Sequence, residues 1–151
     1  MSVTNRETCR DSLATLLSAA LVGTGLPVKV FYGYPAGDFG GQSPAVTLAS
    51  AGSYRSKETI GSCDHAVLRF DIHVFVLYTD RSSWNEDDAE DQLDLIEKAI
   101  AEVILSSANQ GGAKPWMLLD YAEGGTSIDW TTIGGNQYRY EIIPIRMVVE
   151  S

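Results

Sequence analysis

Cysteine and histidine are scarce in this chain of 151 residues, which contains two of each. The two cysteines, Cys9 and Cys63, are too few for a disulfide framework and lack the spacing of metal ligands, so we expect reduced thiols. Long apolar runs are missing as well. No stretch reaches the roughly 18 residues that a membrane span needs, and the first ten residues are polar. We therefore expect neither a secretion signal nor a membrane anchor.

Basic side chains are also few, with 11 Lys and Arg against 20 Asp and Glu and a formal charge of −9. Such a charge repels nucleic acid and argues against a protein that grips DNA by its phosphates, although an acidic protein can still surround DNA without binding it. The hydrophobic share of 44% and the charged share of 21% are ordinary. A chain of this length and composition is expected to fold as one domain with its own core.

The stretch 66–104 organises the chain. Apolar side chains occupy every even position from 66 to 78 while polar ones alternate with them at first, which predicts a half-buried strand. Ser83-Trp-Asn-Glu86 has the spacing of a capping box and predicts a helix that begins near Trp84. Apolar residues then recur at helical spacing as far as Ile104, so this helix is expected to pack on the sheet.

The rest of the chain alternates strand patterns with turn-forming stretches. A second capping-box pattern, Thr4-Asn-Arg-Glu7, predicts a first helix that ends at Gly23. The order α-β-β-β-α-β-β-β predicts an α+β fold, in which two helices pack on one face of a single, mostly antiparallel (mixed) sheet of about six strands. The other face is then solvated or covered by another subunit. The remaining strands are expected at 27–32, 45–49, 115–121, 127–133 and 137–149.

We expect one domain over residues 1–151, with extended loops at 33–43, 52–65 and 120–136. The segment 52–64 is a candidate contact arm, because loops of this length are usually functional or disordered. In the last strand the apolar positions change from even to odd, which predicts a β-bulge near Pro144.

No pattern of catalytic or metal-binding residues emerges. Cys63-Asp-His65 places its three side chains on alternating sides of an extended chain, where they cannot form a triad. His73 has too few histidine or cysteine companions for a zinc site. The acidic run 86–91 lacks the spacing of a calcium loop and is typical of a helix N-terminus. We therefore expect no catalytic residue, no metal site, no cofactor and no enzymatic activity.

Aromatic residues in glycine-rich loops are the unusual feature, because such residues often anchor protein–protein interfaces. The alternative is that several of them fold back onto their own core. Arginine and lysine in the 52–64 arm extend the candidate surface and could instead face a DNA channel. The candidate subunit or partner interface comprises Tyr34, Phe39, Tyr54, Arg55, Lys57, Trp84 and Trp130.

Several stretches, in this order of elements, resemble the tail terminator (tail completion) proteins of long-tailed bacteriophages, the family that includes minor tail protein U. The resemblance covers nearly the whole chain and depends on loose patterns. The stretches are Leu21-Val-Gly23, Val28-Lys-Val-Phe-Tyr-Gly-Tyr-Pro35, Ser43-Pro-Ala-Val-Thr-Leu48, Leu68-Arg-Phe-Asp-Ile-His-Val-Phe-Val-Leu-Tyr78 with the acidic-capped helix after it, and Tyr138-Arg-Tyr-Glu-Ile-Ile-Pro-Ile145.

The resemblance implies a structural virion protein that forms a homohexameric ring on the tail tube, ends tube polymerisation and provides the surface for head docking. Its implied partners are other copies of itself, the tail tube protein and a head-completion or neck protein. DNA would pass through the ring without specific binding, and no membrane is involved. The implied location is the head-proximal end of the virion tail, after assembly in the host cytoplasm.

A ring built from one chain needs contact between two different surfaces of each subunit. We expect the segments 52–64 and 120–136 to supply one side of this contact. The main alternative is another phage neck or tail component, such as a head-closure protein or a tube subunit. A cellular binding module and a small enzyme with an acidic cleft are further alternatives, since α+β sheets host many functions.

Overall fold

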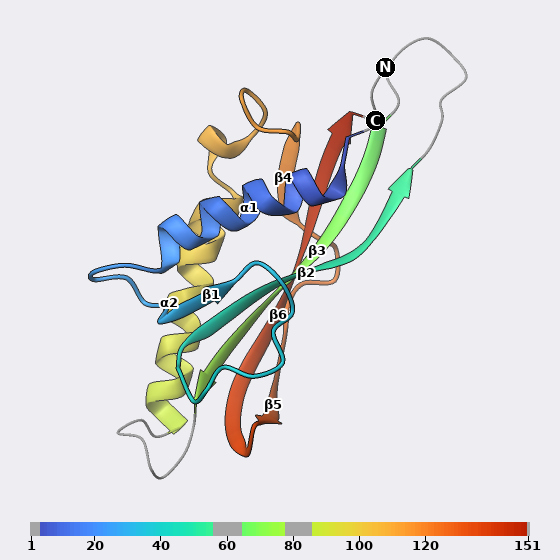
Figure 1. Ribbon diagram of the computed structural model, residues 1–151. Helices are drawn as coiled ribbons and strands as arrows, with labels where there is room; N and C mark the ends of the chain where they lie inside the picture. The colour runs from blue at the N-terminus through green and yellow to red at the C-terminus, as the bar shows by residue number, and fades with distance from the viewer. Residues whose placement is uncertain (1–3, 56–64, 78–85, 151) are drawn as a thin grey trace.

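The computed structural model describes residues 4–55, 65–77 and 86–150 (Figure 1). Two helices and six strands follow one another in the order α-β-β-β-α-β-β-β, as predicted, with one short 3-10 helix added after the second helix. The elements are α1 (Arg6–Leu21), β1 (Val30–Tyr32), β2 (Ala45–Arg55), β3 (His65–Leu77), α2 (Glu86–Ile104), η1 (Ser107–Asn109), β4 (Leu118–Tyr121), β5 (Ser127–Ile133) and β6 (Asn136–Glu150).

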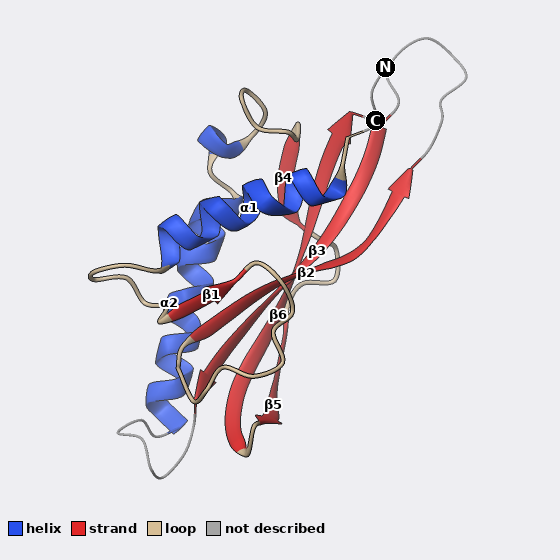
Figure 2. Ribbon diagram, viewed as in Figure 1, coloured by secondary structure: helices blue, strands red, loops and turns tan. Residues whose placement is uncertain are grey.

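The six strands form one mixed sheet in the order β1-β2-β3-β6-β4, and β5 pairs with the other half of the β6 edge that β4 uses (Figure 2). Strand β1 runs parallel to β2, whereas every other pairing is antiparallel. A two-residue turn joins β5 to β6, and both of its residues, Gly134 and Gly135, have positive φ angles of 59° and 80°. Such a turn matches the twist of paired strands, which explains the two glycines.

The main core lies between the two helices and the sheet face formed by the even positions of β3. Helix α1 contributes Leu13 and Leu17, and α2 contributes Leu93 and Ile96, all of them fully buried. Each such side chain stabilises the fold by about 1.5–3 kcal/mol. Both helices therefore cover the same face of the sheet, as the sequence predicts.

A second, smaller cluster lies on the opposite face. There the loop between β1 and β2 folds over one half of the sheet and buries Phe39 against Phe75 and Tyr138. The expectation of a second face that is solvated or covered by another subunit is thus wrong for this half, because the chain's own loop covers it. The other half carries the polar positions of β3 and β6.

The predicted bulge near Pro144 is wrong. Strand β6 pairs with β3 in one continuous register from Glu150 to Tyr138, and the irregularity lies in β2 between Ser50 and Gly52. The apolar positions of β6 change parity because its first half packs on the second cluster and its second half packs on the main core. Pro144 lies at the break between β4 and β5, where its carbonyl accepts a hydrogen bond from the Ala122 N–H at 2.8 Å.

Other sequence predictions need smaller corrections. The N-cap of α1 is Asn5 rather than Thr4, because the Asn5 side chain accepts a hydrogen bond from the Glu7 N–H at 2.7 Å. Strand β2 continues to Arg55, so the expected loop at 52–65 starts as strand. The expected loop at 120–136 contains the predicted strand at 127–133, which is β5, and it also overlaps the end of β4. The capping box at 83–86 lies outside the described residues.

Neither of the two described helices is long and apolar enough to span a membrane.

Candidate functional site

The structure separates the candidate interface residues into exposed and buried ones. Tyr34 and Tyr54 are 59% and 66% exposed, whereas Phe39 is 2% exposed. Phe39 is therefore a core residue, and the prediction that its side chain lies on the surface is wrong. Arg55 donates a hydrogen bond from its Nη2 to the Thr4 carbonyl at 2.9 Å, so it ties the end of β2 to the start of α1. Lys57 and Trp84 lie outside the described residues.

Trp130 takes part in a chain of contacts that joins β5, β6 and α2. The Arg139 guanidinium lies 4.8 Å from the centre of the Trp130 ring, and its Nε donates to a Glu90 carboxylate oxygen at 2.7 Å. Arg139 thus makes a cation–π contact and an ion pair together. Trp130 keeps part of its surface exposed at the margin of the sheet.

The margin formed by β4 and β5 carries further exposed apolar side chains that the sequence analysis missed: Met117, Leu118 and Ile128. On the other margin of the sheet, Leu26 and Tyr34 are exposed near β1. Exposed apolar residues that gather on a surface are typical of protein–protein contacts. Apart from Tyr34, the sequence did not single out these side chains, because only the strand order shows that they lie at the margins of the sheet.

The backbone of the β4–β5 margin is partly capped by side chains. The Gln110 side chain accepts from the Leu119 N–H at 2.7 Å and donates to the Leu119 carbonyl at 3.0 Å, as a neighbouring strand would. Asp120 and Asp129 accept from the N–H groups of the residues that follow them, both at 2.8 Å. Because edge strands with free backbone groups recruit other strands, these caps favour side-chain contacts at this margin over strand addition.

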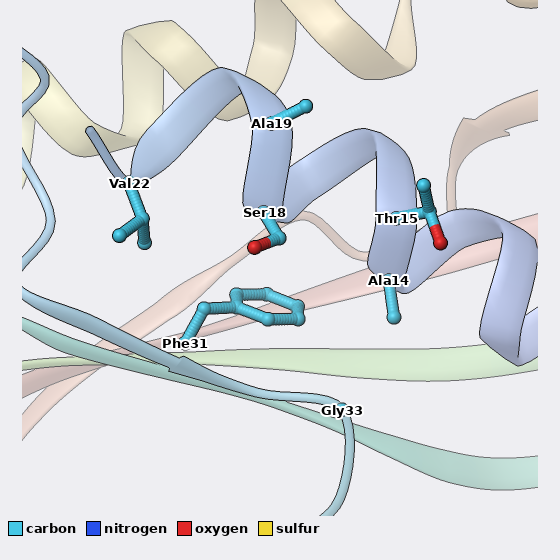
Figure 3. A pocket seen from close by; sticks show the side chains of 7 residues that line it. All are labelled: Ala14, Thr15, Ser18, Ala19, Val22, Phe31 and Gly33. Atoms are coloured by element: carbon cyan, nitrogen blue, oxygen red, sulfur yellow. The ribbon is translucent and has the colours of Figure 1, made fainter.

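A shallow groove of about 500 Å³ lies between α1 and β1 (Figure 3). Small side chains on the helix leave this space open, and the Phe31 ring forms part of its wall. None of its lining residues is charged, and the Thr15 hydroxyl donates a hydrogen bond to the Asp11 carbonyl at 3.0 Å. The groove therefore suits an apolar side chain better than a reacting substrate. It is lined by Ala14, Thr15, Ser18, Ala19, Val22, Phe31 and Gly33.

A second groove, of about 400 Å³, lies on the half of the sheet that the β1–β2 loop leaves open. Arg69 and Arg146 line it from β3 and β6, where they are direct cross-strand neighbours. Tyr54 and Val67 add an aromatic and an aliphatic wall, and Glu123 adds one carboxylate. The groove thus combines charge with exposed apolar surface, as a binding site for another polypeptide does.

Carboxylates gather where α2 crosses β6. Glu141 is 3% exposed and points toward α2, and burial raises its pKa, with further contributions from the charges of Glu97, Asp94 and Glu90. A hydrogen bond from the Thr126 side chain opposes this rise. The Tyr121 hydroxyl donates to Glu97 at 3.1 Å, and burial together with this carboxylate raises the pKa of Tyr121 far above its usual range.

The pKa values of the Cys9 thiol and the His73 imidazole are also shifted. Cys9 is fully buried, which raises the pKa of its thiol, although the charge of Arg55 opposes that rise. Burial lowers the pKa of His73 against the opposing charge of Asp71, and its ring stacks on Phe75 with centres 6.1 Å apart. Within residues 4–55, 65–77 and 86–150, no three His, Cys, Asp or Glu side chains are placed to hold a metal ion. Cys63 lies outside these ranges.

A scan against protein-family models gives no match for this chain, and a search of curated proteins gives none either.

Proposed function

We propose that this protein is a structural subunit of a long-tailed bacteriophage, which forms a ring on the tail tube, ends tube polymerisation and offers a docking surface to the head. The observation that carries the proposal is the arrangement of the stretches that resemble tail terminator proteins. They form β1, β2, β3, α2 and β6 in the expected order, and together they build most of the sheet.

The surface of the subunit supports a ring, since a closed ring of identical chains needs two different surfaces that fit each other. Exposed apolar residues lie on both margins of the sheet, with Ile128 and Trp130 on one and Leu26 and Tyr34 on the other. The uncharged groove between α1 and β1 lies on the second margin. These margins differ in composition, so a contact between them would be heterologous.

The formal charge of −9 fits a ring through which DNA slides, because tight phosphate contacts would hold the DNA back. The proposed partners are other copies of the chain, the tube protein and a neck protein on the head side.

Light scattering behind size-exclusion chromatography, with negative-stain images of each peak, tests this proposal. We expect a closed hexameric ring with a central hole wide enough for duplex DNA. Open-ended cylinders would instead favour a tube subunit. A monomer that also leaves the ends of tail tubes uncapped would refute the proposal.

Deletion of residues 55–61 tests the part of the contact that we assign to the arm. If this segment takes part in the ring contact, the shortened chain stays folded and becomes monomeric. Rings with an unchanged number of subunits would show that the arm takes no part in the interface.

A further inference from the structure

Two arginines face each other on the open half of the sheet. Arg69 and Arg146 are opposite one another across β3 and β6, and neither forms an ion pair or a side-chain hydrogen bond with any residue that the structure describes. The carbonyls of Pro144 and Val148 accept hydrogen bonds from the β4 side, so even positions of β6 turn their backbone groups away from β3. Arg69 and Arg146 therefore form a non-hydrogen-bonded pair of the antiparallel ladder. In such pairs the two side chains lie closer together than in hydrogen-bonded pairs.

Like charges at such a position are unfavourable, and an anionic group between the two guanidiniums would reverse the sign of the interaction. Arginine binds carboxylates and phosphates in this way, through two parallel hydrogen bonds. Glu123 lines the groove, and Asp71 and Asp120 lie on the same face. These acidic neighbours would repel a polyanion such as DNA, whereas a single carboxylate fits between the arginines.

Helix α2 carries most of the charge of the chain. Its sequence has eight acidic side chains and one lysine, a formal charge of −7 against −9 for the whole protein. Asp91 and Asp94 are exposed on its outer surface, next to the exposed side chain of Leu95. The outer surface of α2 thus offers carboxylates beside an apolar side chain, and the groove offers arginines beside Tyr54 and Val67.

The sheet separates these two surfaces within one subunit. Helix α2 packs on the face formed by the even positions of β3, and Arg69 lies at an odd position on the opposite face. The groove of one copy can therefore meet α2 only from another copy. Such a contact joins two different surfaces, which is the kind of interface that builds rings.

We propose that the groove between Arg69 and Arg146 binds the acidic outer surface of α2 from a second copy of this chain, with the carboxylate of Asp91 or Asp94 between the two guanidiniums. This inference rests on the proposed ring function and assigns the subunit contact to the groove and to α2 instead of to the two margins of the sheet. Tyr54 and Val67 would pack against Leu95 of the second copy.

Two charge-reversed variants and their mixture test the contact. The first carries Arg69→Glu and Arg146→Glu, and the second carries Asp91→Lys and Asp94→Lys. The control carries Lys29→Glu and Lys114→Glu, which changes the net charge as the first variant does but lies outside the groove. Near-ultraviolet circular dichroism checks that each variant is folded, and light scattering gives the mass of each variant in solution. Negative-stain images show whether each variant forms a ring on tail-tube ends.

We expect each reversed variant to lose assembly and the control to keep it. Mixing the two reversed variants in equal amounts should restore assembly, because the unchanged helix of the first meets the unchanged groove of the second, and their reversed surfaces also attract. The restored ring would alternate the two variants and hold an even number of subunits.

Rings of wild-type mass from both reversed variants would overturn the inference while leaving the proposed function in place. A wild-type chain that forms no ring, alone or on tubes, would contradict both. Fluorescence anisotropy with a short DNA duplex tests whether the groove binds DNA instead of a second copy. If the arginine variant assembles normally but loses DNA binding that the control retains, the groove is a phosphate site and the proposed contact is wrong.

Discussion

Substitution of Phe39 by alanine should destabilise the subunit strongly, because this loop residue is the centre of the second core. Its ring centre lies 4.8 Å from that of Phe75, 5.7 Å from that of Tyr138 and 5.9 Å from that of Tyr32. Truncation of a buried phenylalanine costs about 3–5 kcal/mol, and each aromatic pair contributes about 0.5–1.5 kcal/mol beyond its buried area. Because a loop can collapse into the space, we expect the lower end, about 3 kcal/mol.

Urea unfolding measures this loss, and thermal unfolding should show Tm lowered by about 6–12 °C, since 1 kcal/mol shifts Tm by about 2–4 °C in a domain of this size. Tyr34→Ala is the matched control from the same loop. Its ring is mostly exposed and makes one T-shaped contact, with Tyr32, among the described aromatic residues, so the loss should stay below about 1 kcal/mol. Equal losses for the two variants would refute the assignment of Phe39 to the core.

Three further changes test single interactions. The buried Tyr138 hydroxyl has no hydrogen-bond partner among the described residues, so Tyr138→Phe should leave the free energy of unfolding unchanged or raise it by about 1 kcal/mol, and a loss in urea unfolding would contradict this. The pKa of Glu141 is raised in the folded state, so its contribution is most favourable at low pH and declines as the pH rises through that pKa. The stability of Glu141→Gln relative to wild type should therefore increase from about pH 4 to about pH 8. If urea unfolding gives the same difference in free energy of unfolding between the two proteins at both pH values, the effect is excluded. Arg69→Glu places a carboxylate opposite Arg146, which should raise the stability of the monomer by up to about 1 kcal/mol at low salt, and high salt should remove the gain.

The elements with the clearest periodicity were predictable from the sequence. Strand β3 alternates apolar and polar residues over much of its length, and the apolar stripe of α2 is regular, so both formed where expected. The order of the remaining elements followed from their own strand, helix and turn patterns. The N-cap was predicted one residue too early, because the spacing from Thr4 to Glu7 matches a capping box, whereas Asn5 caps the helix in the structure.

The failures share a physical cause, which is that the environment of a strand comes from distant parts of the chain. The change of parity in β6 looks the same in sequence whether a bulge or a second covering layer produces it, and the β1–β2 loop supplies that layer. Phe39 has glycine and polar neighbours typical of an exposed loop, yet it is buried. Arg69 and Arg146 are 77 positions apart, and only the strand register makes them neighbours.

The most direct test of the proposed function is the growth of tail tubes from purified tube protein encoded in the same genome. If the protein caps tubes, adding it during polymerisation should shorten the tubes as its concentration rises, with a single ring visible at one end in negative-stain images. Tubes of unchanged length, or tubes that incorporate the protein along their whole length, would contradict the proposal.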